Sequence, residues 1–110
     1  MLKVVALIRR KDGMSTADFL HHWQVDHPAY VDAMPHVQRY VQSPAVPHRT
    51  PWPYDGLAEL WFPSVGAVAE SFASPAADAL RAHEEEFIGA LEWFLTEETL
   101  VPLSSVEERS

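Results

Sequence analysis

"LKVVALIRRKDGMSTADFLHHWQVDHPAYVDAMP", residues 2–35, predicts a buried strand followed by an amphipathic helix. Its first nine residues are mostly apolar and rich in β-branched side chains, which is typical of a strand buried on both faces. The sequence KDG at 11–13 breaks this strand. Ser15 can cap the helix that follows, with Asp18 in the place of a capping-box carboxylate. The proline at the end of the stretch should end that helix near Met34.

An apolar stripe runs along the predicted helix. On a wheel of about 100° per residue, six side chains fall within ~100° of one another: Phe19, Leu20, Trp23, His27, Tyr30 and Met34. His21 lies well away from this stripe and His22 lies near its flank, so both are expected on the solvent side. Asp26 points about 100° away from His27, so these two side chains do not form a ready-made pair.

The middle of the chain predicts two strands joined by a proline-rich loop. "HVQRYVQS", residues 36–43, alternates so that Tyr40 and Arg39 lie on opposite faces. "LAELWF", residues 57–62, alternates in the same way. Its two faces carry Ala58, Leu60 and Phe62 on one side and Leu57, Glu59 and Trp61 on the other. The intervening "PAVPHRTPWPYDG" is too rich in proline for regular structure, and a loop of this length is more often functional than idle.

The last third of the chain predicts two short helices and a strand. Ser64 and Ser74 are each placed to cap a helix, and a proline follows Ser74 at the first helical position. The second helix is expected to carry four apolar side chains: Leu80, Phe87, Ile88 and Leu91. "WFLTEETLVP", residues 93–102, closes as a fourth strand. A domain of residues 1–102 is then followed by a flexible tail at 103–110.

The predicted order of elements is β-α-β-β-α-β, with the second helical part split in two. This order indicates an α+β, ferredoxin-like fold, in which helices cover one face of a four-stranded antiparallel sheet. The first strand is apolar on both faces, and Leu57 and Trp61 lie on the face that no helix covers. A bare apolar face of this size is rare in monomers. We therefore expect a homodimer that packs sheet against sheet around an interior.

Composition excludes several classes of partner. The formal charge of −8 argues against nucleic acid, which needs a basic surface. The chain has no cysteine, which excludes disulfides and thiolate metal sites and fits a reducing cytoplasm, the expected location. The apolar run from Val4 to Ile8 is too short for a signal peptide or a membrane span, so no membrane partner is expected. No G-x-G phosphate loop or G-x-S-x-G elbow is present.

The histidine spacing predicts no metal site and no cofactor. His22 and His27 are five residues apart and point about 140° away from each other on an α-helix, unlike an i, i+4 pair of ligands. The chain contains no H-E-x-x-H sequence. Two alternatives stay open: three histidines gathered from different segments, and haem with His27 as an axial ligand.

Several pieces of the sequence, taken in order, resemble EthD-domain proteins of the dimeric α/β-barrel superfamily. The helix carries the spaced pattern Phe19, Trp23, His27 and Pro28. The pattern continues with "RYVQS", "PYDGLAELWF", "SFASP" and "EEEF", which begin at residues 39, 53, 71 and 84. Together these pieces span most of residues 2–102. The resemblance implies a dimeric α/β barrel, in agreement with the dimer expected from the bare face of the sheet.

The resemblance also implies a class of function. EthD-like proteins include members of ether-degradation clusters, a muconolactone methylisomerase, and small cyclases, dehydratases or decarboxylases of aromatic polyketide pathways. The wider superfamily also has haem binders and monooxygenases. We therefore expect a cofactor-free isomerase, cyclase or lyase that acts by proton transfer on an apolar aromatic, polyketide-like or lactone substrate. The alternative is a non-catalytic protein that binds a hydrophobic metabolite.

Three residues are candidates for catalysis. His27 can serve as a general base in an enclosed pocket, or it can be a structural histidine bonded to backbone. Tyr40 can donate a hydrogen bond to a developing oxyanion, or lie at the surface. Glu59, at the centre of a strand, must be paired, solvated or shifted in pKa. The alternative for Glu59 is a salt bridge to Arg39 or Arg9.

Further residues are candidates for substrate binding. Trp23 and Tyr30 chiefly pack the helix on the sheet and can also form a pocket wall. Arg39 and Trp61 belong to the expected dimer interior. Four loop side chains are candidates for a lid over a flat apolar substrate, or for an ordered connection held by prolines: His48, Arg49, Trp52 and Tyr54. His83, beside the glutamates of "EEEF", is expected on a solvated helical face.

Overall fold

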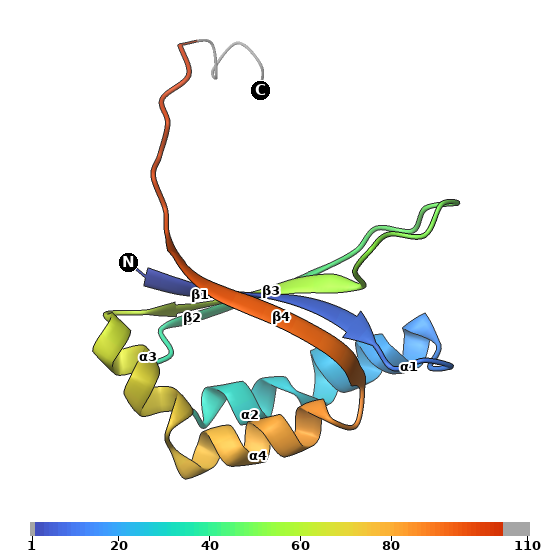
Figure 1. Cartoon of the computed structure of the whole chain (residues 1–110), viewed down its shortest axis with the longest axis horizontal. Coiled ribbons are helices and arrows are strands. Elements are labelled where there is room, and N and C mark those ends of the chain that lie inside the picture. The colour runs from blue at the N-terminus through green and yellow to red at the C-terminus, as the bar shows by residue number, and fades with distance from the viewer. Residues whose placement is uncertain (1, 105–110) are drawn as a thin grey trace.

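The computed structural model describes residues 2–104 (Figure 1). Its elements, in chain order, are β1 (Leu2–Arg10), α1 (Thr16–His21), the π-helix η1 (His22–Asp26), α2 (Pro28–Asp32), β2 (Arg39–Pro44), β3 (Gly56–Phe62), α3 (Val65–Phe72), α4 (Pro75–Glu84) and β4 (Ile88–Glu97). Of the tail expected at 103–110, residues 105–110 lie outside the described part of the chain.

The four strands form one antiparallel sheet in the order β2-β3-β1-β4, and the helices cover one of its faces (Figure 1). This arrangement confirms the ferredoxin-like prediction. Alternation along the strands divides the sheet into a helix-facing side and an outer side. Ala6 pairs with Ala58 on β3 and Trp93 on β4, and these three side chains face the helices.

The predicted boundary between the second helical part and the last strand is wrong. Helix α4 ends at Glu84, and β4 begins at Ile88, so Ile88 and Leu91 are strand residues. Pairing with β1 decides the boundary, since Arg10 lies opposite Ile88 and Arg9 opposite Ala90. The residue skipped in this register is Gly89, where an added Cβ would lie 2.8 Å from the Arg10 carbonyl oxygen. A glycine is therefore required at this bulge.

The long helix predicted after Ser15 is interrupted by a π-turn. Ser15 caps α1 as predicted, with its Oγ accepting from the Asp18 N–H at 3.1 Å. At the π-turn, the His27 N–H donates to the His22 carbonyl oxygen at 2.9 Å, five residues back. Proline has no N–H to donate, and its ring crowds the carbonyl four residues earlier. The wider turn just before Pro28 accommodates that ring within a continuous helical path.

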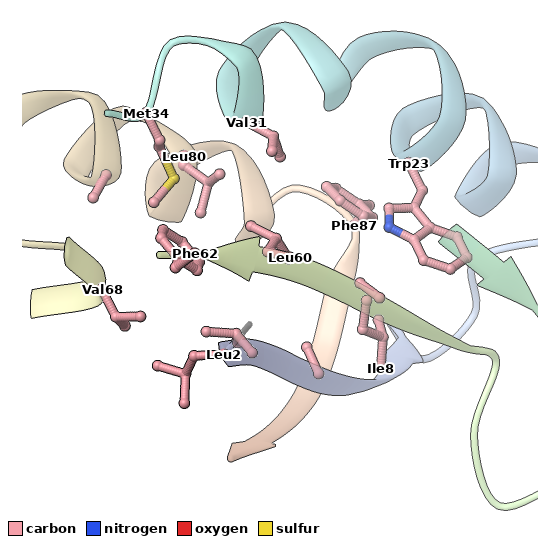
Figure 2. Packing of buried hydrophobic residues seen from close by; sticks show 14 of the residues in the cluster. Leu2, Ile8, Trp23, Val31, Met34, Leu60, Phe62, Val68, Leu80 and Phe87 are labelled. Carbon is pink, nitrogen blue, oxygen red and sulfur yellow. The ribbon is translucent and has the colours of Figure 1, made fainter. Parts of the chain in front are cut away.

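The hydrophobic core lies between the helices and the helix-facing side of the sheet. Figure 2 shows Val31 and Leu80 on the helices, and Met34 in the turn after α2, facing Leu60 and Phe62 on β3. Trp23 and Phe87 pack at the other end of this core, and both side chains are fully buried. The predicted packing role of Trp23 is thus confirmed.

Replacing Gly56 by alanine is expected to destabilise the protein by about 1–3 kcal/mol, as overpacking commonly does. An added Cβ would lie 2.5 Å from Cη2 of the buried Trp23 ring. Urea unfolding monitored by circular dichroism measures the effect. Gly66→Ala is the matched control, because its nearest non-neighbouring atom, Ser64 Oγ, is 3.8 Å away and alanine favours the α3 helix. Equal stability of the two variants would contradict the tight packing of Trp23 on β3.

Candidate functional site

A cavity of about 640 Å³ lies between the helix-facing side of the sheet and the helices. Most of its wall is apolar, and both the strands, with Val4, Leu60 and Trp93, and the helices, with Val31 and Leu80, contribute to it. Four ionisable side chains interrupt this wall: His27, Tyr40, Arg81 and Glu84. The volume is in the range of pockets that bind small organic molecules.

His27 is the most deeply buried of these groups, with 4% of its surface exposed. Its Nδ1 lies 2.9 Å from Nδ1 of His83, and its Nε2 lies 4.0 Å from Oε2 of Glu84. Burial, together with the smaller effect of the neighbouring His83, lowers the pKa of His27 to about 4. His27 is therefore a neutral imidazole at pH 7, held between two side chains of α4.

His83 does not lie on a solvated helical face, as the sequence predicted. It is 5% exposed, and its ring stacks on Tyr30 with centroids 4.5 Å apart. Helices α2 and α4 lie side by side (Figure 1), so this face of α4 is covered. The sequence did contain a pattern that indicates burial of His83, because Leu80, His83 and Phe87 recur at the spacing of one helical face. The glutamates that follow His83 favoured the opposite interpretation, a solvated face.

Glu84 is a candidate site residue that the sequence pattern did not single out. Its side chain lines the cavity, and burial raises its pKa to about 7, although Arg81 acts in the opposite direction. A carboxyl group with a pKa near neutrality, beside an imidazole in an apolar cavity, has the properties of an acid–base group. Its position one residue after His83 brings it to the cavity side of the same helical turn.

Tyr40 lines the same cavity from β2. Its hydroxyl oxygen accepts from Nε2 of Gln42 at 2.7 Å, and that amide also donates to the Trp23 carbonyl oxygen at 2.7 Å. Burial is the main reason that the pKa of Tyr40 is raised, so the hydroxyl keeps its proton at neutral pH. The structure therefore places Tyr40 on the helix-facing side of the sheet with His27, a side that the alternation alone did not assign to it.

Glu59 lies on the outer side of the sheet and does not meet His27 or Tyr40. Its Oε2 accepts from Nζ of Lys3 at 2.6 Å, so the predicted partners Arg39 and Arg9 are wrong. The reason is the register, which places Lys3 on β1 opposite Trp61, two residues from Glu59 and on the same face of the sheet. Glu59 and Tyr40 thus cannot serve one small substrate within the same protomer.

Arg39 and Trp61 also lie on the outer side. The Arg39 guanidinium lies 4.5 Å from the centroid of a Trp61 ring, and Nε1 of Trp61 donates to Oε1 of Glu98 at 3.0 Å. With Lys3 and Glu59 these side chains form one cluster, separated from the cavity by the sheet itself. The predicted location of Trp61 opposite the helices is confirmed.

The loop between β2 and β3 does not cover the cavity of His27. His48 and Trp52 pack on each other with ring centroids 4.6 Å apart, and the Trp52 Nε1 donates to the Val46 carbonyl oxygen. They line a different hollow, of about 1040 Å³, next to Asp55 and Arg9. Figure 1 shows this loop extending away from the helices. The predicted lid is therefore wrong for the cavity within one protomer.

The π-turn changes the expected arrangement of the histidines. His22 is stacked on Phe87 with its ring centroid 6.1 Å from that of His83, so His22 and His27 approach the same side chain. Within residues 2–104, His22, Asp26 and His83 form a group whose donor atoms lie within 4.8 Å of one another. Two imidazoles and a carboxylate suit Zn²⁺ chemically, although His27 already occupies Nδ1 of His83.

Fold and cavity together define the class of this protein: a ferredoxin-like α+β protein with a largely apolar cavity that contains a buried imidazole and a carboxyl group. The sequence also matches the model of the EthD domain over residues 11–90. The chain belongs to the EthD-domain family. A search of the curated proteins finds no match to it.

Solved structures support the same fold. An ethyl tert-butyl ether (EthD) family protein from Bacillus halodurans is similar, with a TM-score of 0.77 and 16% identity over 90% of this chain and 99% of that chain. A hypothetical Arabidopsis thaliana protein has a TM-score of 0.71 and 22% identity, covering 93% and 91%. A dimeric ferredoxin-like protein of unknown function from Thermobifida fusca has a TM-score of 0.70 and 14% identity, covering 86% and 88%.

None of the helices within residues 2–104 combines the length and the apolar character needed to cross a bilayer.

Proposed function

We propose that this protein is a cofactor-independent enzyme that transfers protons on a small apolar molecule bound in the cavity. The observation that carries the proposal is the convergence of His27, Glu84 and Tyr40 on one otherwise apolar cavity. A carrier needs few polar groups, whereas an acid–base enzyme needs at least two that meet at one place. Family membership supports a substrate that is aromatic, polyketide-like or a lactone.

The three side chains have complementary roles in this proposal. Nε2 of His27 takes a proton from the carbon next to a carbonyl group, and the Glu84 carboxylate, 4.0 Å away, stabilises the imidazolium that forms. The Tyr40 hydroxyl donates a hydrogen bond to the carbonyl oxygen as it gains negative charge. The apolar wall excludes water and strengthens both interactions. Isomerisation, aldol-type cyclisation, dehydration and decarboxylation all use such a step.

A ligand titration tests the location and the class of the substrate. Aromatic polyketide-like and lactone compounds are added to isotope-labelled protein, and the histidine ring signals are followed by NMR. A substrate-like compound is expected to shift the signals of His27 and leave those of His36, which bonds Glu70 at the surface, unchanged. Turnover of that compound supports the enzyme, and binding without turnover supports the alternative of a metabolite-binding protein. Absence of binding by every class contradicts both.

We also infer that two copies associate through the outer side of the sheet. Phe94 on β4 is 53% exposed there, and the segment after β4 exposes further apolar side chains as it extends away from the helices (Figure 1): Leu100, Val101 and Leu103. The dimeric Thermobifida fusca protein of the same fold supports this association. A dimer buries the apolar groups that a single copy leaves in water.

The substitution Phe94→Glu is expected to shift the protein from dimer to monomer, because it introduces a charge into the centre of the proposed apolar interface. Sedimentation velocity over a range of concentrations measures the change. Val25→Glu is the matched control, since Val25 is 63% exposed on the π-turn, on the helical side of the molecule. A monomeric wild-type protein, or dissociation by both variants alike, would contradict the assignment of the outer side.

A further inference from the structure

The π-turn before Pro28 deprives one backbone carbonyl group of its usual partner in the helix. In an α-helix, the N–H of His27 would donate to the Trp23 carbonyl oxygen, four residues earlier. In this protein, the His27 N–H donates to the His22 carbonyl oxygen instead. The next residue, Pro28, has no N–H to offer. The Trp23 carbonyl oxygen is therefore available to a donor from another element of the fold.

Gln42 on β2 supplies that donor. Its Nε2 lies 2.7 Å from the Trp23 carbonyl oxygen and 2.7 Å from the Tyr40 hydroxyl oxygen. The first contact fixes the orientation of the amide, because a carbonyl oxygen only accepts hydrogen bonds, so the amide atom that faces it must be the nitrogen. An amide NH₂ group has two hydrogens, one for each oxygen, and accepts none. The Tyr40 oxygen therefore accepts from Gln42, and its own hydrogen is left for another acceptor.

The hydroxyl hydrogen of Tyr40 is available to the cavity. Tyr40 and Gln42 are two residues apart on one face of β2, and of the two only Tyr40 lines the cavity. Within residues 2–104, no carboxylate or carbonyl oxygen takes this hydrogen. Burial raises the pKa of Tyr40, and hydrogen bonds from the side chains of Gln42 and Trp23 oppose that change. Such bonds stabilise negative charge on the oxygen, so they make the hydroxyl a stronger donor.

We propose that Gln42 is a positioning residue, which holds the Tyr40 hydroxyl as a hydrogen-bond donor toward the cavity and so selects ligands with an acceptor oxygen, such as a carbonyl group. Gln42 does not line the cavity, so it acts through Tyr40 and does not touch the ligand. The Trp23 carbonyl group anchors the amide from behind. The catalytic meaning of this arrangement rests on the proposed function, in which Tyr40 stabilises the charge on a carbonyl oxygen.

The direction of this hydrogen bond can be measured on the full chain at pH 7 by ¹³C NMR of protein labelled at Cζ of its tyrosines. Tyr40→Phe identifies the Tyr40 signal among those of the three tyrosines. Gln42→Glu is expected to move this signal toward the position of the phenolate, because an ionised carboxylate accepts the hydroxyl hydrogen and donates none. Gln42→Met removes the donor at similar side-chain length and should cause a smaller movement. Gln24→Glu is the matched control, since Gln24 is exposed on the π-turn, and should leave the signal unchanged.

An unchanged Tyr40 signal in Gln42→Glu, or an equal movement in Gln24→Glu, would overturn the inference. If circular dichroism shows that the added charge prevents folding, an unchanged signal in Gln42→Met has the same meaning. With a compound identified by the ligand titration, Gln42→Met is expected to reduce kcat about tenfold with little change in KM, a smaller loss than removal of an oxyanion donor causes. The NMR measurement needs no turnover, so the inference can fail while the proposed function stands. Normal turnover by Tyr40→Phe would contradict the proposed role of Tyr40 alone.

Discussion

Replacement of His27 by glutamine is expected to reduce turnover of the true substrate by about 10²–10⁴-fold, the usual contribution of a general base. Glutamine is polar and similar in length, but it takes no proton at neutral pH. Because the apolar wall of the cavity is unchanged, binding should fall much less than turnover. The loss is therefore expected in kcat, with KM changed only slightly. Steady-state kinetics on a compound identified by the NMR titration measures both.

His21→Gln is the control for this variant. His21 lies six residues before His27 on the same helical segment, and its side chain is 66% exposed. It should retain wild-type kinetics, which separates the role of His27 from a general effect of removing a histidine. Full activity of His27→Gln would rule out proton transfer by this side chain. Equal losses in both variants would point to a structural cause.

The substitution Glu84→Gln is expected to stabilise the protein above pH 7, by about 2 kcal/mol at pH 8. Burial raises the pKa of Glu84 from 4.5 to about 7, so folding favours the protonated carboxyl. Its contribution to stability is fully present below pH 4.5 and is lost as the pH rises through about 7. This shift in the pKa of Glu84 corresponds to roughly 3 kcal/mol of folding free energy. The Glu84 side chain is 24% exposed, and solvent screening reduces that value. Glutamine carries no charge and avoids the loss.

Denaturant unfolding of wild type and Glu84→Gln at several pH values measures the difference. The two proteins should be equally stable near pH 4 and diverge as the pH rises. The same variant should lose activity, because no carboxylate remains to stabilise the His27 imidazolium. Glu86→Gln removes an exposed carboxylate two residues away and should show neither effect. A Glu84→Gln variant less stable than wild type at pH 8 would show that the carboxylate is well paired or solvated.

The contribution of His27 to folding stability changes with pH in the opposite direction to that of Glu84. Its pKa is lowered from 6.5 to about 4, so folding favours the neutral imidazole. Its contribution to stability is present above pH 6.5 and is lost as the pH falls through about 4. Between pH 4.5 and 6.5 the two groups therefore oppose each other. Wild type should depend less on pH in this range than either single variant does.

Sequence periodicity was sufficient for most of the sheet. Alternation placed Tyr40 and Arg39 on opposite faces of their strand, and Glu59 and Trp61 on the outer side, because a strand has a period of two whatever packs on it. The last strand was harder, since Leu80, Phe87, Ile88 and Leu91 also fit a helix. Pairing with β1 resolves this ambiguity, and that pairing is a long-range interaction that local pattern does not contain.

Only part of the candidate site could be predicted. His27 stood out because it is the one histidine in an apolar stripe. His22 was misplaced because a wheel of about 100° per residue assumes a regular α-helix, whereas the π-turn before Pro28 changes the direction of the side chains. Glu84 looked like one of several surface glutamates, and its burial depends on the packing of α4 beside α2. That packing is a tertiary property.

The single layer of the sheet has a consequence for how this family can diverge. On β1 and β3, even-numbered residues such as Ala6 and Leu60 border the cavity, and odd-numbered ones such as Val5 and Glu59 face away from it. One substitution therefore alters one of these two surfaces and leaves the other nearly intact. Under the proposed function and association, a relative can therefore change the cavity that binds its substrate while it retains the surface through which copies associate, or the reverse. Such independence allows low overall identity to coexist with a common fold.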